Sequence, residues 1–321
     1  MKNQNLPMLS IVVPCCNEEA VIPDFMNEIA IVLNEMNGVD YELIFVDDGS
    51  DDATLSLLRE FAKGDAHVRY ISFSRNFGKE AAMLAGLEIS SGDYVAVMDV
   101  DLQHPPALLP GMYAAITEEG YDCAATRRES RRGEPLIRSF FARKFYRLIN
   151  KISRTEIVEG ACDYRLMTRQ FVDAVLSLKE YNRFSKGIFG WVGFKTKWIS
   201  FENLPRAAGD AKWSLWRLFL YAVDGIIGFS TAPLAIASIS GILFCISAFL
   251  GVLFIVIRWL IMGDPVAGWA STACIILFAS GVQLFCLGIL GQYLAKSYME
   301  TKRRPRYIIR ESSHINNNTE I

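Results

Sequence analysis

The chain has 321 residues, of which 51% are hydrophobic and 21% are charged, and its formal net charge is −2. This balance excludes a largely disordered chain and argues against a general nucleic-acid-binding protein, which would carry a basic excess. Seven cysteines scattered over this length do not form a disulfide framework, so we interpret them as small buried hydrophobic residues of a reducing compartment.

The first hundred residues alternate apolar strand patterns with amphipathic helical patterns. We predict strands over 9–15, 41–47, 68–74 and 94–99. We predict helices over 19–36, from a cap at Ser50 or Asp51 to about Ala62, and over 77–89. This alternation predicts an α/β fold with a mostly parallel sheet, which binds ligands at the carboxyl ends of its strands. No G-x-G-x-x-G follows the first strand, which argues against an NAD enzyme.

Polar clusters follow each of the four predicted strands, and the last contains two close carboxylates, Asp99 and Asp101. Two carboxylates at the end of a buried strand repel each other, and burial makes both charges costly. A divalent cation would relieve this, and hard oxygen ligands suit Mg²⁺ or Mn²⁺. The alternative interpretation is a turn with solvated carboxylates.

Two long segments, 225–257 and 265–295, contain no Asp, Glu, Lys or Arg. A bilayer core of about 30 Å needs roughly 20 helical residues, so we predict transmembrane helices near 233–257 and 269–293. The alternative is a pair of buried core helices. Basic residues flank the outer ends of the pair, which places both termini in the cytoplasm. Small-residue spacings such as Ala237-x-x-x-Gly241 permit helix packing and therefore a homo-oligomer.

A basic segment, residues 127–154, carries ten Lys or Arg side chains against two Glu. From Leu136 it has helical spacing with aromatic residues among the basic ones, which indicates binding at a membrane surface. The alternative is a solvated charged face.

Four motifs, in the order P-x-x-N-E-E, D-D-G-S, S-R-N-F-G-K and D-x-D-L-Q-H-P-P, resemble glycosyltransferase family 2 of the GT-A fold. More narrowly, the chain resembles the polyprenyl-phosphate sugar synthases, which include dolichol-phosphate mannose synthase and the bacterial bactoprenol glucosyltransferases. The two apolar spans match the bacterial two-helix subgroup. The resemblance implies a GT-A catalytic domain, with a Rossmann-like and mostly parallel sheet, followed by interfacial helices and a transmembrane hairpin.

The resemblance also implies roles for individual residues. Asp163, in C-D-Y-R-L-M, matches the family's G-D-F-R-L element and would act as catalytic base or position the acceptor. Read without the resemblance, Asp163 would be a polar cap before a helix. The ligands of the nucleotide sugar would be Pro14, Asn17, Glu18, Asp47, Asp48, Lys79, Asp99 and Gln103. Asp99 and Asp101 would hold Mg²⁺ or Mn²⁺, and the acceptor phosphate would bind Arg128, Arg131, Arg138, Arg206 and Lys212.

The implied reaction is inverting transfer of one sugar to undecaprenyl phosphate for cell-envelope glycosylation, with UDP-glucose as the first choice of donor. The partners would be a nucleotide sugar, a polyprenyl phosphate lipid and the bilayer, without nucleic acid. The donor alternatives are a UDP-N-acetylhexosamine, GDP-mannose and a UDP-aminopentose. From another class, the chain could be an inactive membrane scaffold, although Asp99, Asp101 and Asp163 are intact.

The implied organisation has four parts. Residues 1–212 would form the cytoplasmic catalytic domain, 213–230 an interfacial helix, 231–295 the transmembrane hairpin and 296–321 a basic cytoplasmic tail. The resemblance to the bacterial subgroup implies a multi-pass protein of the inner, cytoplasmic membrane.

Overall fold

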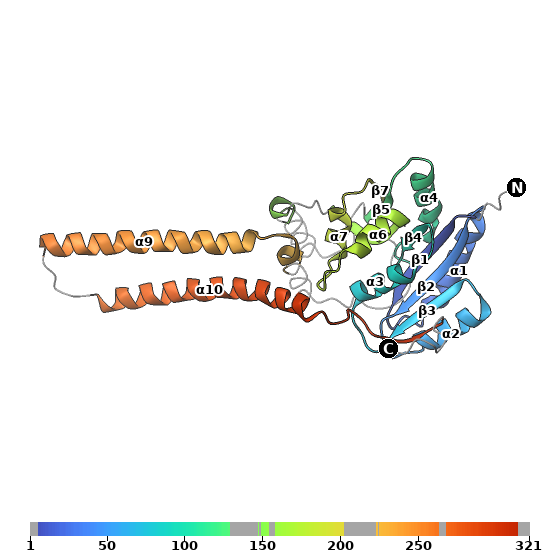
Figure 1. Ribbon diagram of the computed structural model, residues 1–321, viewed down its shortest axis with the longest axis horizontal. Helices are drawn as coiled ribbons and strands as arrows, with labels where there is room; N and C mark the ends of the chain where they lie inside the picture. Colours follow the sequence, from blue (N-terminus) through green and yellow to red (C-terminus); the bar gives the residue numbers. More distant parts are fainter. Residues whose placement is uncertain are drawn as a thin grey trace.

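The computed structural model describes residues 6–128, 147, 149–153, 158–201, 223, 225–262 and 268–313. An α/β domain lies at one end of the long axis, and a hairpin of two long helices projects from it (Figure 1). The strands are β1 (Met8–Cys15), β2 (Asp40–Asp47), β3 (Val68–Phe73), β4 (Tyr94–Val97), β5 (Cys123–Arg128), β6 (Ala161–Thr168), β7 (Thr196–Phe201) and β8 (Ile309–Ser312).

These eight strands form one sheet in the order β7-β5-β6-β4-β1-β2-β3-β8. β1 pairs in parallel with β2 and β4, and β2 pairs in parallel with β3. β6 runs antiparallel between β4 and β5, and β8 runs antiparallel along β3. The predicted mostly parallel α/β sheet is therefore confirmed, with antiparallel strands added on both sides of the parallel core.

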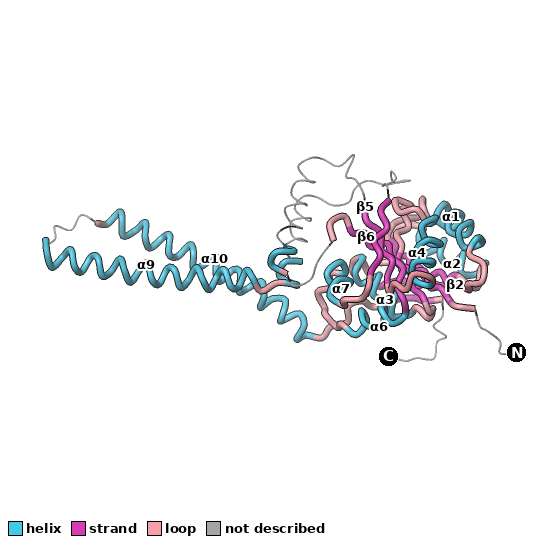
Figure 2. Tube along the Cα trace, turned by 90° about the horizontal axis from the view of Figure 1, so that it is seen from above, coloured by secondary structure: helices cyan, strands magenta, loops and turns pink. Residues whose placement is uncertain are grey.

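Helices cover both faces of the sheet (Figure 2). α1 (Ile22–Glu35), α2 (Thr54–Gly64) and α4 (Leu109–Thr117) pack on one face, where Leu9, Ile11 and Val13 of β1 join their core. α3 (Lys79–Ile89), α6 (Arg169–Ser177) and α7 (Ser185–Trp191) pack on the other face, against Val12 of the same strand. A short 3-10 helix, η1 (Pro106–Leu108), precedes α4. Because successive side chains of a strand point to opposite faces, β1 supplies both cores.

One local prediction about a helix start is wrong, and so is the alternative interpretation of Asp163 as a helix cap. α2 begins at Thr54 with Ala53 as its N-cap, and no side chain caps it. Ser50 and Asp51 instead bond to Asn17: the Asn17 amide donates to Ser50 Oγ over 2.9 Å, and the Asp51 amide donates to Asn17 Oδ1 over 2.8 Å. Asp163 does not cap a helix either, because it lies inside β6 and Thr168 caps α6.

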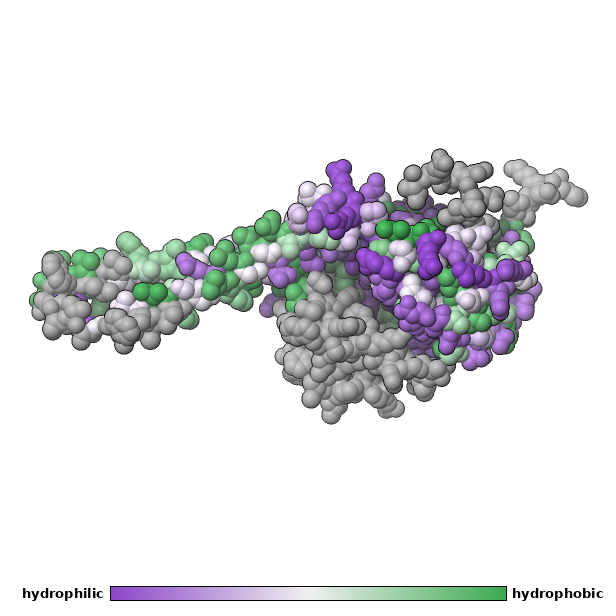
Figure 3. Space-filling model, turned by 90° about the horizontal axis from the view of Figure 1, so that it is seen from below, coloured by the Kyte–Doolittle hydropathy of each residue, from purple (hydrophilic) through white to green (hydrophobic). Residues whose placement is uncertain are grey.

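The hairpin consists of α9 (Ala232–Met262) and α10 (Trp269–Lys302). The two helices contact each other through Phe244 and Phe278, whose ring centroids are 5.4 Å apart. Segments Ala232–Arg258 and Phe278–Lys302 are long and apolar enough to cross a membrane. Their large apolar side chains face outward rather than into a protein core, and Figure 3 shows hydrophobic residues along the projecting hairpin.

The chain returns to the sheet after α10. β8 extends the sheet beyond β3, and the Arg59 Nε–H donates to Glu311 Oε1 over 2.7 Å. Glu311 Oε1 also accepts from the Tyr70 hydroxyl over 2.6 Å. At the base of the hairpin, the Tyr293 hydroxyl donates to the Ser230 carbonyl over 2.6 Å. This bond joins α10 to the segment that precedes α9.

Candidate active site

The loops after β1, β2 and β3 meet at the carboxyl edge of the parallel strands. Asn17, at φ 56°, joins the β1 loop to the segment after β2 through its bonds to Ser50 and Asp51. The Glu18 amide donates to Thr54 Oγ1 over 2.9 Å. Pro14 is buried in β1 opposite Val46 of β2, where its missing N–H removes one donor from the strand.

Asp47 and Asp48, which we call the loop carboxylates, are both buried and bonded within the protein. Asp47 accepts from the Ser50 amide over 3.0 Å and from the Ser72 hydroxyl over 2.6 Å. Asp48 accepts from the amides of Phe77 and Gly78 over 2.6 and 2.9 Å. Burial raises the pKa of Asp48, and these two N–H donors only partly oppose the effect. The loop carboxylates thus hold the turn after β2 against the loop after β3.

Gly49 allows that close approach. It has φ 69°, and a Cβ built on it would lie 2.5 Å from the carbonyl carbon of Arg75. Any side chain here would push the two loops apart.

A second group of side chains meets on the β4–β6 side of the edge. Lys79 Nζ, from the first turn of α3, lies 2.6 Å from Asp99 Oδ1 and 2.7 Å from Asp163 Oδ2. Burial alone would lower the pKa of Lys79, but Asp163 and Asp99 overcome it and raise the pKa above its usual range. Burial alone would raise the pKa of Asp163, but Lys79 and then Lys186 hold it well below its usual range. Lys79 is therefore a cation and Asp163 an anion at neutral pH.

Asp101 and His104 complete this group. Asp99, Asp101 and His104 each offer one ligand atom, and these atoms lie within 4.8 Å of one another. The turn that brings them together includes Leu102 at φ 55°, and the Gln103 amide donates to Asp101 Oδ1 over 3.1 Å. We call Lys79, Asp99, Asp101, His104 and Asp163 the Lys79 cluster.

The donor set of the Lys79 cluster fits a divalent cation. His104 is 4% exposed, and neither of its ring nitrogens has a hydrogen-bond partner among the described residues. Burial lowers the pKa of His104, so its ring is neutral and can offer a lone pair. Two carboxylates and a neutral imidazole are suitable ligands for Mn²⁺, and the carboxylates also suit Mg²⁺.

The structure brings many of the predicted site residues together. Asp99, Asp101, Lys79 and Asp163 share one cluster, and the backbone of Gln103 lies in it. Arg128 ends β5, where its charge acts on His104 and Cys162. The remaining residues predicted to bind the acceptor phosphate lie outside the described residues: Arg131, Arg138, Arg206 and Lys212. His104 was not among the predicted site residues, although it stands inside the D-x-D-L-Q-H motif.

Arg165 lies two residues after Asp163 in β6 and is 2% exposed. Its Nη2 donates to the Cys162 carbonyl over 3.0 Å, and its guanidinium carbon lies 3.7 Å from the centre of the Phe189 ring. These contacts place a buried cation behind Asp163 and fix β6 against α7.

Comparison with known proteins identifies the kind of protein that carries this site. Residues 10–176 match the family described as Glycosyl transferase family 2. The chain belongs to this family. It is therefore a glycosyltransferase.

Relatives of similar length cover nearly the whole chain. The SfII prophage-derived bactoprenol glucosyl transferase of Shigella flexneri is 40% identical over 96% of this chain and 99% of its own length. The prophage bactoprenol glucosyl transferase homolog of Escherichia coli K12 is 39% identical over 94% of this chain and 98% of its own. Among solved structures, glucosyl-3-phosphoglycerate synthase from Mycobacterium tuberculosis is 21% identical, with a TM-score of 0.45 over 69% of this chain and 77% of that chain.

Proposed function

We propose that this glycosyltransferase transfers one sugar, with inversion, from UDP-glucose to undecaprenyl phosphate. The observation that carries the proposal is the Lys79 cluster, in which carboxylates, a neutral imidazole and a lysine meet at the carboxyl edge of the sheet. The names of the relatives at about 40% identity support the bactoprenol acceptor and the glucosyl group.

Asp99, Asp101 and His104 would hold Mg²⁺ or Mn²⁺. The ion would neutralise the charge that develops on the departing nucleoside diphosphate. Lys79 would then supply a second positive charge on the same side of the sugar, because its Nζ already touches Asp99. The loop carboxylates and Asn17 would set the shape of the nucleotide pocket through the loops that they join, together with Pro14 and Glu18.

Asp163 would position the acceptor rather than take its proton. A carboxylate paired with Lys79 and held at a low pKa is a weak base. A phosphate monoester has a second pKa of about 6, so most acceptor molecules at pH 7 are already dianions that need no base. A single displacement on an α-linked donor would give a β-linked product.

The membrane placement is part of the proposal. We assign residues 1–212 to the catalytic domain, 213–230 to an interfacial segment, 231–295 to a membrane-spanning hairpin and 296–321 to a tail, whose strand β8 joins the sheet of the catalytic domain. The outward-facing apolar side chains of α9 and α10 support a bilayer around the hairpin. Basic residues at its domain end support a cytoplasmic catalytic domain in the bacterial inner membrane. The acceptor phosphate would then meet the site at the inner leaflet.

A donor panel tests the proposal. The purified full chain is incubated with Mn²⁺, undecaprenyl phosphate and, separately, UDP-glucose, UDP-N-acetylglucosamine, GDP-mannose or a UDP-aminopentose, and the glycolipid is identified by mass. We expect a hexosyl product with UDP-glucose alone and none after chelation. A product with another donor would replace glucose in the proposal, and donor hydrolysis without a glycolipid would refute the lipid acceptor.

A further inference from the structure

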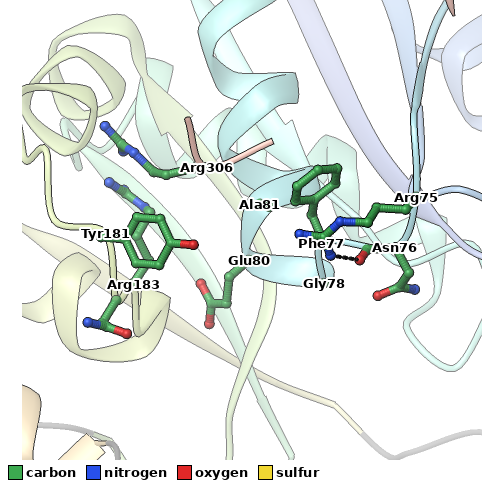
Figure 4. Close-up of a pocket in the computed structure, with 10 residues that line it drawn as sticks. Arg75, Asn76, Phe77, Gly78, Glu80, Ala81, Tyr181, Arg183 and Arg306 are labelled. Carbon is green, nitrogen blue, oxygen red and sulfur yellow. Dashed lines mark hydrogen bonds between the residues drawn. The ribbon is translucent and has the colours of Figure 1, made fainter. Parts of the chain in front are cut away.

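A cavity of about 420 Å³, whose lining residues are drawn in Figure 4, includes no residue of the Lys79 cluster. Its walls come from the loop between β3 and α3, the first turn of α3, the segment before α7 and the segment that follows α10. Lys79 contacts Asp99 and Asp163, whereas its neighbours Gly78 and Glu80 line the cavity. The first turn of α3 therefore separates the two sites.

The lining of this cavity is basic. Three arginines contribute to it, one from each segment outside α3: Arg75, Arg183 and Arg306. The one lining carboxylate, Glu80, accepts from the amide and the hydroxyl of Ser185, so its oxygens are already used inside the domain. Arg183 donates to the Leu178 carbonyl over 2.6 Å. Figure 4 shows the guanidinium groups of Arg183 and Arg306 close together on one wall.

Two donors of the lining are buried without a partner among the described residues. They are Nη1 of Arg306 and Nδ2 of Asn182. Buried donors are nearly always paired in folded proteins, so two orphaned donors on one cavity indicate a missing acceptor. Burial and then the positive charge of the neighbouring Arg306 lower the pKa of Arg183, because a second cation disfavours the charged form of the first. An anion between Arg183 and Arg306 would offset the repulsion between these two cations. Its oxygens would accept hydrogen bonds from Arg306 Nη1 and Asn182 Nδ2.

We propose that this cavity is a second anion site, which binds a phosphate group between Arg306, Arg183 and Arg75. Phosphate matches the site because its several oxygens can accept from guanidinium and amide donors together. The cavity is larger than the phosphate alone, so the ligand can be a phosphate monoester with a small attached group. The site does not depend on the donor and acceptor proposed above.

The phosphate can come from a lipid headgroup or from solution. Arg306 follows the last residue of α10, Lys302, by four residues. If the hairpin spans the bilayer, the cavity lies close to the headgroup layer, where lipid phosphates are concentrated. Only the lipid source rests on that membrane placement.

Binding of inorganic phosphate and of dihexanoyl phosphatidic acid to the full chain in detergent tests the site. The key variant is Arg306→Gln, and the matched control is Arg304→Gln, which removes the same charge from an exposed residue outside the lining. We expect Arg306→Gln to weaken phosphate binding about tenfold and Arg304→Gln to leave it within about twofold, because a charge-assisted contact is lost only in the first. Arg75→Gln, on the opposite wall, provides a second test if Arg306→Gln does not fold.

The two ligands distinguish the sources. Equal affinity for both would assign free phosphate, whereas binding of the phosphatidic acid alone, with dihexanoyl phosphatidylcholine inactive, would assign a lipid headgroup. Absence of binding for both, or equal affinities in Arg306→Gln and Arg304→Gln, would overturn the site. Binding of Mn²⁺ and UDP is measured on the same variants. If Arg306→Gln still binds Mn²⁺ and UDP as the wild type does, the loss of phosphate binding concerns the second site and not the proposed transfer reaction.

Discussion

The two acidic groups at the strand ends differ in how their charges are satisfied. The loop carboxylates, Asp47 and Asp48, have every oxygen bonded to an amide or hydroxyl of the domain. In the Lys79 cluster, Asp99 and Asp163 share one lysine, and neither ring nitrogen of His104 has a hydrogen-bond partner among the described residues. Asp47 and Asp48 therefore stabilise the fold, whereas the Lys79 cluster offers ligand atoms to a cation. Substitutions should therefore cost stability in the first group and activity in the second.

The largest expected effect is on catalysis in the Lys79 cluster. Asp101→Asn should lower kcat/KM on the order of 10³-fold, because it removes a carboxylate from the cation site and with it several kcal/mol of transition-state stabilisation. The Tm should stay unchanged or rise, since a carboxylate that repels Asp99 is neutralised. Glycolipid formation and thermal unfolding measure the two effects.

Asp173→Asn is the control for that variant, because it neutralises a carboxylate on α6 whose side chain is 65% exposed. A large loss of Tm in Asp101→Asn, with activity retained, would reverse the contrast between the two acidic groups.

Lys79→Met should lower kcat by about 10²-fold, the size expected for one preorganised charge at a developing anion. It should also change the pH profile. Lys79 is the main group that lowers the pKa of Asp163, so without it that pKa rises. If transfer needs ionised Asp163, the wild type stays active into the acid range and the variant loses activity at a higher pH. Lys79→Arg, which keeps a cation, should restore the acid limb of the pH–rate profile, that is, the low pH at which the wild type loses activity. Identical acid limbs in Lys79→Met and wild type would separate Lys79 from the ionisation of Asp163.

Asp48→Asn should lower the stability of the catalytic domain by about 2 kcal/mol, because an amide cannot accept from both Phe77 and Gly78 as the carboxylate does. The Tm should fall by several degrees. Asp51→Asn serves as the matched control, since the Asp51 side chain is exposed and its hydrogen bond to Asn17 is made by the backbone amide. A normal Tm in Asp48→Asn would mean that the hydrogen bonds of the loop carboxylates do not stabilise the fold.

The smallest effect concerns the tail. Glu311→Gln should cost about 1 kcal/mol at pH 7, because its partner Arg59 is partly exposed and such pairs contribute little. Hydrogen bonds from Arg59 and then Tyr70 lower the pKa of Glu311 from 4.5 to about 2. A lowered pKa adds stability that is fully present above pH 4.5 and is lost as the pH falls towards 2. Thermal unfolding at pH 7, 5 and 3 should therefore show a difference that shrinks only at the lowest pH, and Glu35→Gln, an exposed substitution, should show none.

The parallel half of the sheet could be predicted because its signal is local. β1 to β4 and the helices between them carry apolar periodicity, and the structure has them with bounds shifted by a few residues. β8 carries no such signal. Its four residues become a strand only because the edge of β3, far away in the sequence, offers free backbone groups.

The candidate site was predictable to a similar extent. Strand-end position pointed to Asp99 and Asp101, but the role of His104 depends on a turn at Leu102 with positive φ, which residue spacing does not reveal. Likewise, Asp163 alone looked like a helix cap, and only the pairing of β6 with β4 and β5 brings it to Lys79. The second cavity joins three segments with no shared motif, so no pattern in the sequence predicts it.

β8 has a further consequence for how the protein behaves when shortened. By lying along β3, it covers a strand edge that would otherwise be open to pairing with another chain. Removing residues from 309 onward would leave the Lys79 cluster in place yet uncover that edge. Self-association, rather than inactivation, is then the first defect to look for in a C-terminally truncated protein.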